Sequence, residues 1–196
     1  MSVCLSSNVA QVQRSNFDQA DKSNLVILDL CGGSGSWSAP YRQAGYAVEV
    51  FDLLTCVDVR FLTYPGRVHG ILAAPPCTYF SLARNGYSCS PEELQDALSI
   101  VDACFRLITI CQPVWWALEN PNGHLRKWLG PPQLTFQPCT YGDPWTKLTN
   151  IWGNFAPLTE CPVYPSRGSI MSIEHTAAKR AITPPGFARA FYEANS

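Results

Sequence analysis

Apolar residues along the first two thirds of the chain gather in short runs, and polar or turn-forming residues follow each run. Four of these runs have the length of a β-strand: residues 25–30, 46–51, 68–73 and 114–118. Runs this short and this continuously apolar are typical of strands that are buried on both faces of a parallel sheet. The pattern therefore predicts four buried strands.

The clearest predicted helix lies between the third and fourth runs. Ser90 can cap its start, Pro91 suits its first position, and Glu93 completes a capping box. Gln112 and Pro113 end it. Its apolar residues recur at steps of three and four, which places them on one buried face: Leu94, Ala97, Leu98, Val101, Phe105 and Ile108. A shorter helix is predicted over residues 36–44.

Strands that alternate with helices predict an α/β protein with a doubly wound, mostly parallel sheet and helices on both of its faces. We expect a flexible leader at residues 1–24 and a main domain over residues 25–155. Residues 156–196 would add a short proline-rich extension to that domain, closed by a helix at 186–194. After residue 130 the pattern weakens, although residues 146–152 could form a strand. Ligands of such sheets bind at the carboxyl ends of the strands.

Composition narrows the class of protein. The 196 residues suffice for one domain, and no apolar run reaches the length of a membrane span. Residues 1–24 lack the apolar stretch of a secretory signal. The nine cysteines are odd in number and include no Cys-x-x-Cys pair, so we expect reduced thiols in a cytoplasmic protein without a metal. The net charge is −1, but residues 120–196 are basic, which suits a polyanion.

A glycine-rich segment, residues 28–37, follows the first strand and opens the first helix. Glycines let the backbone approach a ligand, and a helix N-terminus offers free N–H groups. Asp52 ends the second strand, where it could accept both ribose hydroxyls, and Asp58 could accept from an adenine amino group. Because the dinucleotide fingerprint and the phosphate loop are missing, the pattern favours S-adenosylmethionine over NAD or ATP.

Two other strand ends carry reactive side chains. Pro75 and Pro76 fix the backbone before Cys77, whose thiolate could act as a nucleophile just outside the sheet. Glu119 follows the fourth run, where a carboxyl group could act as an acid or a base. Each residue alone would be an ordinary buried thiol or loop carboxylate. Both residues lie at the edge of the sheet where a ligand is predicted to bind, and this shared position favours a catalytic role.

Taken in order, these segments resemble the motifs of the DNA cytosine-5 methyltransferase family. That family carries an Asp-Leu-Phe-Cys-Gly loop, acidic residues after the next strands, Pro-Pro-Cys, Glu-Asn-Val and Tyr-Gly-x-Pro-Gln-x-Arg-x-Arg. This chain offers residues 28–35, Asp52 with Asp58, Pro75-Pro76-Cys77, Glu119-Asn120-Pro121 and residues 141–149. The resemblance spans about residues 25–155, and the compact form is most similar to members carried by phages.

The resemblance implies a Rossmann-like, S-adenosylmethionine-dependent methyltransferase that modifies carbon 5 of a cytosine flipped out of DNA. It implies that Cys77, Glu119 and Lys147 are catalytic. The implied cofactor site comprises Asp29, Cys31, Gly32, Gly33, Ser34, Gly35, Trp37, Asp52, Leu53, Asp58, Val59 and Pro75. The implied substrate site comprises Pro76, Thr78, Ser81, Asn120, Pro121 and Thr149.

The chain departs from the family pattern at three places. Pro121 stands where the family has valine, while Lys147 and Thr149 stand where it has two arginines. Lysine keeps one positive charge but not the bidentate geometry of arginine. The region that reads the target is reduced to about residues 156–180, and the last motif is faint, at residues 183–187. We therefore expect either a partner chain that adds specificity or broad modification of cytosines.

Other interpretations stay open. Enzymes that methylate an amino group resemble Asp/Asn-Pro-Pro-Tyr/Phe, whereas this chain has Ala-Pro-Pro-Cys. A degenerate subunit would hold nucleic acid or cofactor without catalysis; the lost arginines favour it, and the retained Cys77 and Glu119 do not. The same chemistry could also act on RNA or a free nucleotide, or transfer a group other than methyl.

Overall fold

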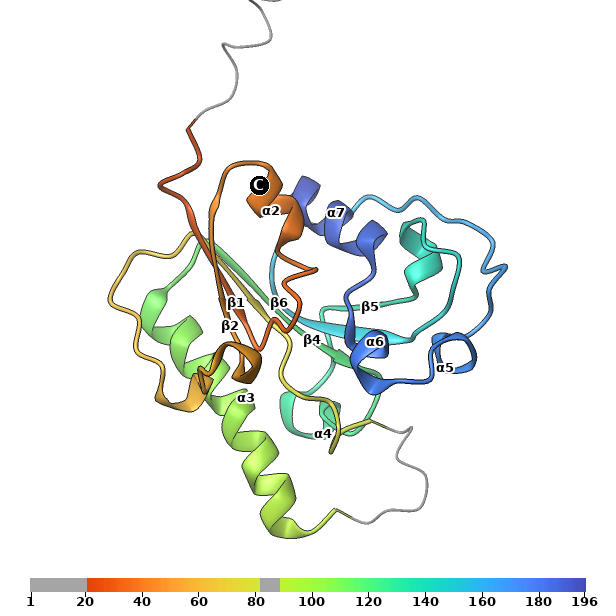
Figure 1. Ribbon diagram of the computed structural model, residues 1–196, viewed down its shortest axis with the longest axis horizontal. Helices are drawn as coiled ribbons and strands as arrows, with labels where there is room; N and C mark the ends of the chain where they lie inside the picture. The colour runs from red at the N-terminus through yellow and green to blue at the C-terminus, as the bar shows by residue number, and fades with distance from the viewer. Residues whose placement is uncertain (1–20, 82–88) are drawn as a thin grey trace, which may run out of the picture.

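The computed structural model describes residues 21–81 and 89–196, and its centre is a six-stranded sheet (Figure 1). The predicted leader, residues 1–24, lies outside the described residues except for residues 21–24. The strands are β1 (Val26–Leu30), β2 (Ala47–Phe51), β3 (Gly70–Ala73), β4 (Trp115–Pro121), β5 (Leu134–Phe136) and β6 (Thr149–Asn154). Their order in the sheet is β2-β1-β3-β4-β6-β5.

The sheet is mostly parallel, as predicted. Strands β2, β1, β3 and β4 run in one direction, and β6 is antiparallel to both of its neighbours, β4 and β5. The chain moves from β1 outward to β2 and then crosses to β3 on the other side of β1. This reversal of winding creates a switch point between β1 and β3, where open α/β sheets bind ligands beyond the carboxyl ends of the strands.

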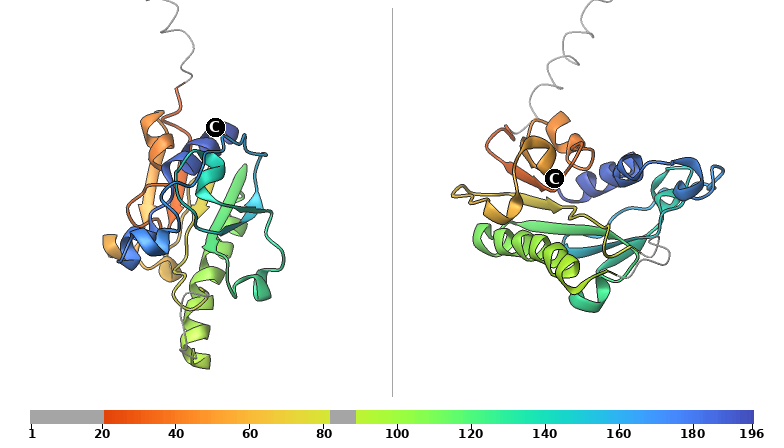
Figure 2. Two further views of the ribbon diagram at one scale, coloured as in Figure 1. Left: turned by 90° about the vertical axis from the view of Figure 1, so that its right-hand side faces the viewer. Right: turned by 60° about the horizontal axis from the view of Figure 1, so that its bottom comes forward.

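Helices cover both faces of the sheet, which confirms the doubly wound α/β class. Figure 2 shows α3 (Pro91–Cys111) on one face, and α2 (Ala39–Gln43) and α7 (Pro185–Ala194) on the other. The remaining helices are short: η1 (Leu53–Thr55), η2 (Val59–Phe61), α4 (Arg126–Leu129), η3 (Pro138–Tyr141), α5 (Ile170–Ile173) and α6 (Ala177–Ala181). No helix in the described part of the chain is long and apolar enough to cross a membrane.

The capping box predicted for α3 is present. The backbone N–H of Glu93 donates to Ser90 Oγ at 3.2 Å, and the backbone N–H of Ser90 donates to the Glu93 carboxylate at 3.0 Å. The helix ends before Gln112, whose φ of 46° is left-handed. Its buried face, which includes Val101 and Leu107, packs on one side of the sheet.

An aromatic cluster fills the opposite side of the sheet and explains the predicted closing helix. Phe187 and Phe191 of α7 are fully buried there. The Phe187 ring stacks on Phe136 of β5 with centroids 4.0 Å apart, and both α7 rings contact Trp37. This packing fixes the course of the segment that precedes α7, because that segment must reach Trp37 from the far edge of the sheet.

Several predicted boundaries need correction. The predicted fourth strand at residues 114–118 continues through Pro121, because residues 119–121 pair with residues 149–151 of β6. The predicted strand at 146–152 begins later, at Thr149, and the helix predicted at 36–44 is shorter, at Ala39–Gln43. Residues 156–183, which show no periodicity, contain the two short helices α5 and α6.

Candidate active site

A cavity of about 940 Å³ opens beyond the carboxyl ends of β1, β3 and β4. Its walls include the glycine loop after β1, the turn after β2, the proline turn after β3, the end of β4 with residues 146–148, and the C-terminal stretch that includes α6. In Figure 1, α5 and α6 lie near the carboxyl end of β4. The cavity therefore lies at the topological switch point, where the fold favours a ligand.

The glycine loop turns sharply and leaves its backbone open to the cavity. Cys31, Gly33 and Gly35 adopt left-handed backbone angles, with φ of 55°, 52° and 67°. A Cβ atom on Gly32 would lie 2.4 Å from the Asp29 carboxylate, so this position accepts no side chain without displacing Asp29. Gly32 and Gly33 line the cavity, as do Cys31, Ser34 and Trp37.

Asp29 is a fully buried carboxylate at the floor of this loop. Its Oδ2 atom accepts a hydrogen bond from the Ser38 hydroxyl at 2.5 Å, but Oδ1 has no partner among the residues that the structure describes. Burial raises the pKa of Asp29 to about 6, and the Ser38 bond opposes this rise. Because Asp29 lines the cavity, a cationic group of a ligand nearby would stabilise its buried charge.

Asp52 connects the glycine loop to the turn after β2. Its Oδ2 atom accepts from the backbone N–H of Gly33 at 3.0 Å, and its Oδ1 atom accepts from the N–H of Leu54 at 2.9 Å. These bonds orient the carboxylate at the edge of the cavity, which Asp52 also lines. Leu54, a residue that the sequence did not single out, lines the cavity beside it.

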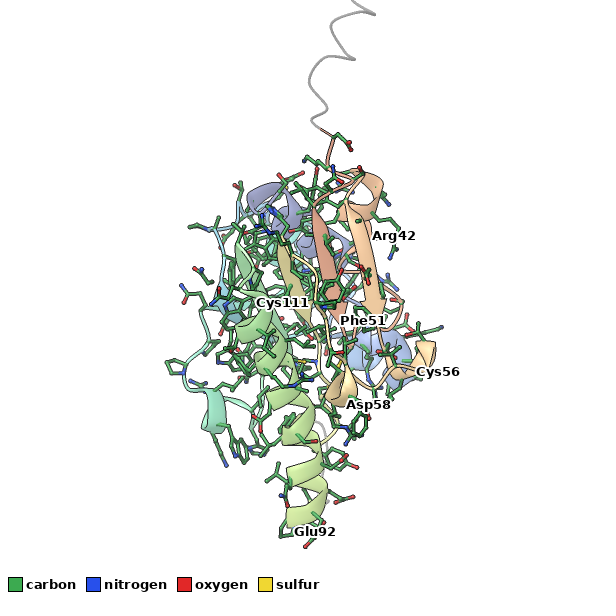
Figure 3. The ribbon with its side chains drawn as sticks, turned by 90° about the vertical axis from the view of Figure 1, so that its left-hand side faces the viewer. Arg42, Phe51, Cys56, Asp58, Glu92 and Cys111 are labelled. Carbon is green, nitrogen blue, oxygen red and sulfur yellow. The ribbon has the colours of Figure 1, made fainter. Side chains whose placement is uncertain are left out.

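Four of the predicted cofactor residues do not line the cavity: Gly35, Leu53, Asp58 and Val59. The Asp58 carboxylate pairs with Arg60, whose Nη2 atom is 2.6 Å from Oδ2, and Arg60 also pairs with Asp96 of α3. Figure 3 shows Asp58 beyond the end of β2 and beside α3. The Arg60 pair lowers the pKa of Asp58. That Asp58 binds the adenine of a cofactor stays a prediction.

Cys77 lies in the proline turn after β3 and lines the cavity together with Pro75, Pro76, Thr78 and Ser81. The carbonyl oxygen of Cys77 accepts from the N–H groups of Phe80 and Ser81 at 3.0 and 2.9 Å, which closes the turn. Burial and the charge of Glu119 raise the pKa of the Cys77 thiol, whereas Lys147 and Arg180 oppose that rise. At neutral pH the raised pKa favours the thiol of Cys77 over the thiolate.

Glu119 and Lys147 form an ion pair in the same cavity. Their charged atoms are 3.6 Å apart, and both side chains are mostly buried, with 14% and 12% exposed. Glu119 is held in β4 opposite Ile151, and the backbone N–H of Lys147 donates to Gln137 Oε1 at 2.8 Å. The three residues predicted as catalytic thus face one space, although they come from three separate parts of the chain.

Two predicted substrate residues support the site from outside the cavity. Asn120 is fully buried, and its Nδ2 atom donates to the carbonyl oxygen of Pro75 at 3.0 Å. Thr149 is also buried, and its hydroxyl donates to the carbonyl oxygen of Lys147 at 2.9 Å. Asn120 therefore holds the proline turn, and Thr149 holds the backbone of Lys147. Pro121, by contrast, lines the cavity.

The largest part of the site that the sequence did not predict is the C-terminal wall of the cavity. It comprises Ser169, Ile170 and Met171, followed by every residue from Ala177 to Thr183. The Thr183 N–H donates to the Ser36 hydroxyl at 3.1 Å, and the Gly186 N–H donates to Asp143 Oδ2 at 2.9 Å. The faint motif at residues 183–187 was the one signal that could have placed this wall against the glycine loop.

Comparison with known proteins adds no evidence about the function of this chain. No family model matches the chain, and no curated protein matches it. One similar solved structure, from E. coli, is provisionally described as a DNA modification methyltransferase encoded within a prophage. The two are 19% identical with a TM-score of 0.47, and the likeness covers 66% of this chain and 46% of that one. This chain thus spans less than half of that protein, and the likeness supports no functional argument.

Proposed function

We propose that this chain transfers a methyl group from S-adenosylmethionine to carbon 5 of cytosine in DNA, through a covalent bond to Cys77. The observation that carries the proposal is the meeting of Cys77, Glu119 and Lys147 in the cavity that the glycine loop also lines. The volume of about 940 Å³ lies within the range of cavities that hold ligands of this size. The ordered resemblance to cytosine-5 methyltransferases supplies the reaction.

The residues at the glycine end fit the proposed cofactor. Asp29 presents an unpaired carboxylate oxygen for the amino group, and Asp52 presents a partly exposed carboxylate for ribose hydroxyls. Trp37 adds a buried ring N–H that has no partner in the described part of the chain. The cofactor would supply an activated methyl group. These residues would orient that group toward the proline turn, where Cys77 lies.

The residues at the other end fit a cytosine ring. The thiolate of Cys77 would add to ring carbon 6, so that a sulfur–carbon bond forms and the displaced electron pair reaches ring nitrogen 3. Glu119 would give nitrogen 3 a proton and thereby make carbon 5 nucleophilic toward the methyl group. Carbon 5 would then bond to the methyl group as the bond between that methyl group and the cofactor sulfur breaks. A base would remove the proton from carbon 5, the thiolate would leave as the ring double bond re-forms, and nitrogen 3 would return its proton to Glu119.

The electrostatics of the site support a coupling between Cys77 and Glu119. The negative charge of Glu119 disfavours the thiolate in the ligand-free protein. Once Glu119 carries a proton for ring nitrogen 3, this repulsion disappears, while the positive charges of Lys147 and Arg180 remain. The nucleophile would therefore be activated when the base is in place, which protects the thiol before binding.

Mass spectrometry of digested bases tests the proposal. The protein is incubated with S-adenosylmethionine and, in separate reactions, cytosine-containing DNA, RNA or nucleotides. We expect 5-methylcytosine from DNA, none from Cys77→Ser, and undiminished product from the control Cys56→Ser, which changes an exposed thiol outside the cavity. Product confined to RNA or nucleotides, methyl on an amino group, or no modified base in any reaction would reject the proposed function in favour of the corresponding alternative.

A substrate analogue tests the covalent step directly. DNA with fluorine at carbon 5 of cytosine lacks the proton that must leave, so the adduct should persist. We expect a DNA–protein adduct for the unaltered chain and for Cys56→Ser, and none for Cys77→Ser. An adduct that maps to a residue other than Cys77 would contradict the assignment of the nucleophile.

A further inference from the structure

A second cavity of about 310 Å³ lies directly beside the first. The two share the lining residues Lys147, Ile170, Lys179, Arg180, Ile182 and Thr183. The smaller cavity extends on the far side of Lys147, toward Trp145 and Arg167. A ligand whose base occupies the first cavity could therefore place an adjoining group in the second.

The lining of the second cavity is strongly cationic. It includes Lys147, Arg167, Lys179 and Arg180, and Glu174 is the one carboxylate among the described residues that line it. Lys147 is balanced by Glu119, and Lys179 lies 3.6 Å from Glu174. The guanidinium groups of Arg167 and Arg180 remain without a carboxylate partner among the described residues. Two such groups at one small cavity create a site for an anion.

Both arginines are held in place by their surroundings. The Nη1 atom of Arg180 donates to the carbonyl oxygens of Glu174 and His175 at 3.1 and 3.2 Å, which orients the guanidinium group. The guanidinium carbon of Arg167 lies 5.7 Å from the centroid of the Trp145 ring. The backbone N–H of Arg167 also donates to the Pro144 carbonyl oxygen at 2.9 Å. Such orientation reduces the entropy that a ligand would cost on binding.

We propose that the second cavity binds a phosphate group that adjoins the target cytosine nucleoside, with Arg167 and Arg180 as its main donors. The inference rests on the proposed function for the placement of the base in the first cavity. Arg180 and Lys147 line both cavities, so one nucleotide spans them. The shared chemistry is a phosphate, which can be a diester in a strand or the monoester of a free nucleotide.

Binding of short single-stranded DNA with one cytosine tests the phosphate site. One form of the DNA carries ordinary phosphates, and the other carries neutral methylphosphonates on both sides of the cytosine. We expect the unaltered chain to bind the neutral form about tenfold more weakly, as for the loss of one charge-assisted bond. Arg167→Gln should discriminate less between the two forms than the unaltered chain does, because Arg180 remains as the one main donor. Arg167 is exposed, so the variant should fold normally.

Arg67→Gln is the matched control, because Arg67 is exposed and precedes β3, at the opposite end of the parallel strands from both cavities. It should discriminate between the two DNA forms as the unaltered chain does. Equal binding of both forms by the unaltered chain would overturn the proposal. So would full discrimination in Arg167→Gln.

Competition with small ligands distinguishes the two sources of phosphate. Deoxycytidine 5′-monophosphate should displace the labelled DNA better than deoxycytidine if the site accepts a monoester, and no better if it requires a diester. Whether the phosphate site exists at all is decided by the comparison of the two DNA forms. These assays need no methyl transfer. Phosphate-dependent binding without any modified base would therefore uphold the phosphate site and reject the proposed function. Methylation of cytosine together with equal binding of the two DNA forms would uphold the proposed function and reject the phosphate site.

Discussion

The side-chain amide of Asn120 donates a hydrogen bond to the carbonyl oxygen of Pro75, 3.0 Å away. This bond joins the end of β4 to the turn after β3, so it links the element that carries Glu119 to the one that carries Cys77. Asn120 is fully buried. The relative position of the proposed nucleophile and the proposed acid therefore depends on a residue that does not line the cavity.

Asn120→Ala should lower turnover while cofactor binding stays nearly unchanged. The substitution removes the donor to Pro75 in a buried place, which should cost about 1–3 kcal/mol of stability. Urea unfolding measures that loss, and calorimetry with S-adenosylmethionine measures cofactor affinity. Asn154→Ala, at the exposed end of β6, is the control and should leave both unchanged. Full turnover in Asn120→Ala would show that Cys77 does not depend on this bond.

The charge of Glu119 should control the reactivity of Cys77. Because that charge raises the pKa of the thiol, Glu119→Gln should increase the thiolate fraction and speed alkylation several-fold near pH 8. Lys147→Gln should slow alkylation, because the lysine charge lowers the pKa of the thiol. Mass spectrometry of the Cys77 peptide after timed iodoacetamide treatment gives the rates, with the exposed Cys56 as an internal reference. Equal Cys77 rates in all three proteins would exclude this coupling.

The parts of the fold that could be predicted are those whose signal is local. Ser90 and Glu93 form their capping box within one turn, and the apolar runs of β1, β3 and β4 are mostly buried because each of these strands has neighbours on both sides. The run of β2, which was also predicted to be buried, lies at the edge of the sheet and is only half-buried. The strand β5 has only three residues and takes its place at the sheet edge from pairing with β6. Such pairing is a tertiary effect that a short sequence window does not contain.

The candidate site also contains residues that a local sequence signal predicts and residues that only tertiary packing places. Cys77 and Glu119 could be predicted because Cys77 follows β3 and Glu119 lies near the carboxyl end of β4, and parallel strands end at one edge. Arg180 could not be predicted from the sequence, because α6 has only five residues, too few to show a helical pattern of apolar positions. It reaches the cavity because Phe187 and Phe191 anchor α7 on the far face of the sheet, and the chain must pass over the site to arrive there.

Asp29→Asn should stabilise the ligand-free protein and weaken cofactor binding. The folded protein holds the Asp29 proton more tightly than the unfolded chain, because its pKa rises from 3.8 to about 6. The stability of the unaltered protein relative to Asp29→Asn should thus fall as the pH rises from about 4 to 6. Above that range the buried charge should cost on the order of 3 kcal/mol.

Thermal unfolding at pH values on both sides of about 6 measures this difference, and calorimetry at the higher pH measures cofactor affinity. Asp21→Asn serves as the control, because Asp21 is exposed and far from the cavity lining. Cofactor affinity of the unaltered protein should also decrease as the pH falls through about 6, since a protonated Asp29 no longer attracts an ammonium group. A pH-independent difference in stability would show that the pKa of Asp29 is the same in the folded and the unfolded chain.

The isolated chain should recognise at most a few bases around the target cytosine. Sequence is read by side chains that reach base edges, whereas contacts to phosphates only position the protein. Residues 156–183 contain only the short helices α5 and α6, and their cavity-lining residues close the wall of the site. Their cations, Arg167, Lys179 and Arg180, line the proposed phosphate site. Little of this segment is therefore left to contact base edges.

Bisulfite sequencing of a long DNA of mixed sequence, treated with the pure protein, measures this context. We expect scattered modification or a context of about two bases, and an affinity that falls with salt because phosphates supply much of the binding energy. Arg167→Gln should reduce the salt dependence, by about 0.7 in the logarithmic slope for a single strand, without changing which bases flank the modified cytosine. Modification confined to one longer defined site would instead mean that residues 156–183 read base edges. A change in the bases that flank the modified cytosine in Arg167→Gln would mean that Arg167 contacts base edges.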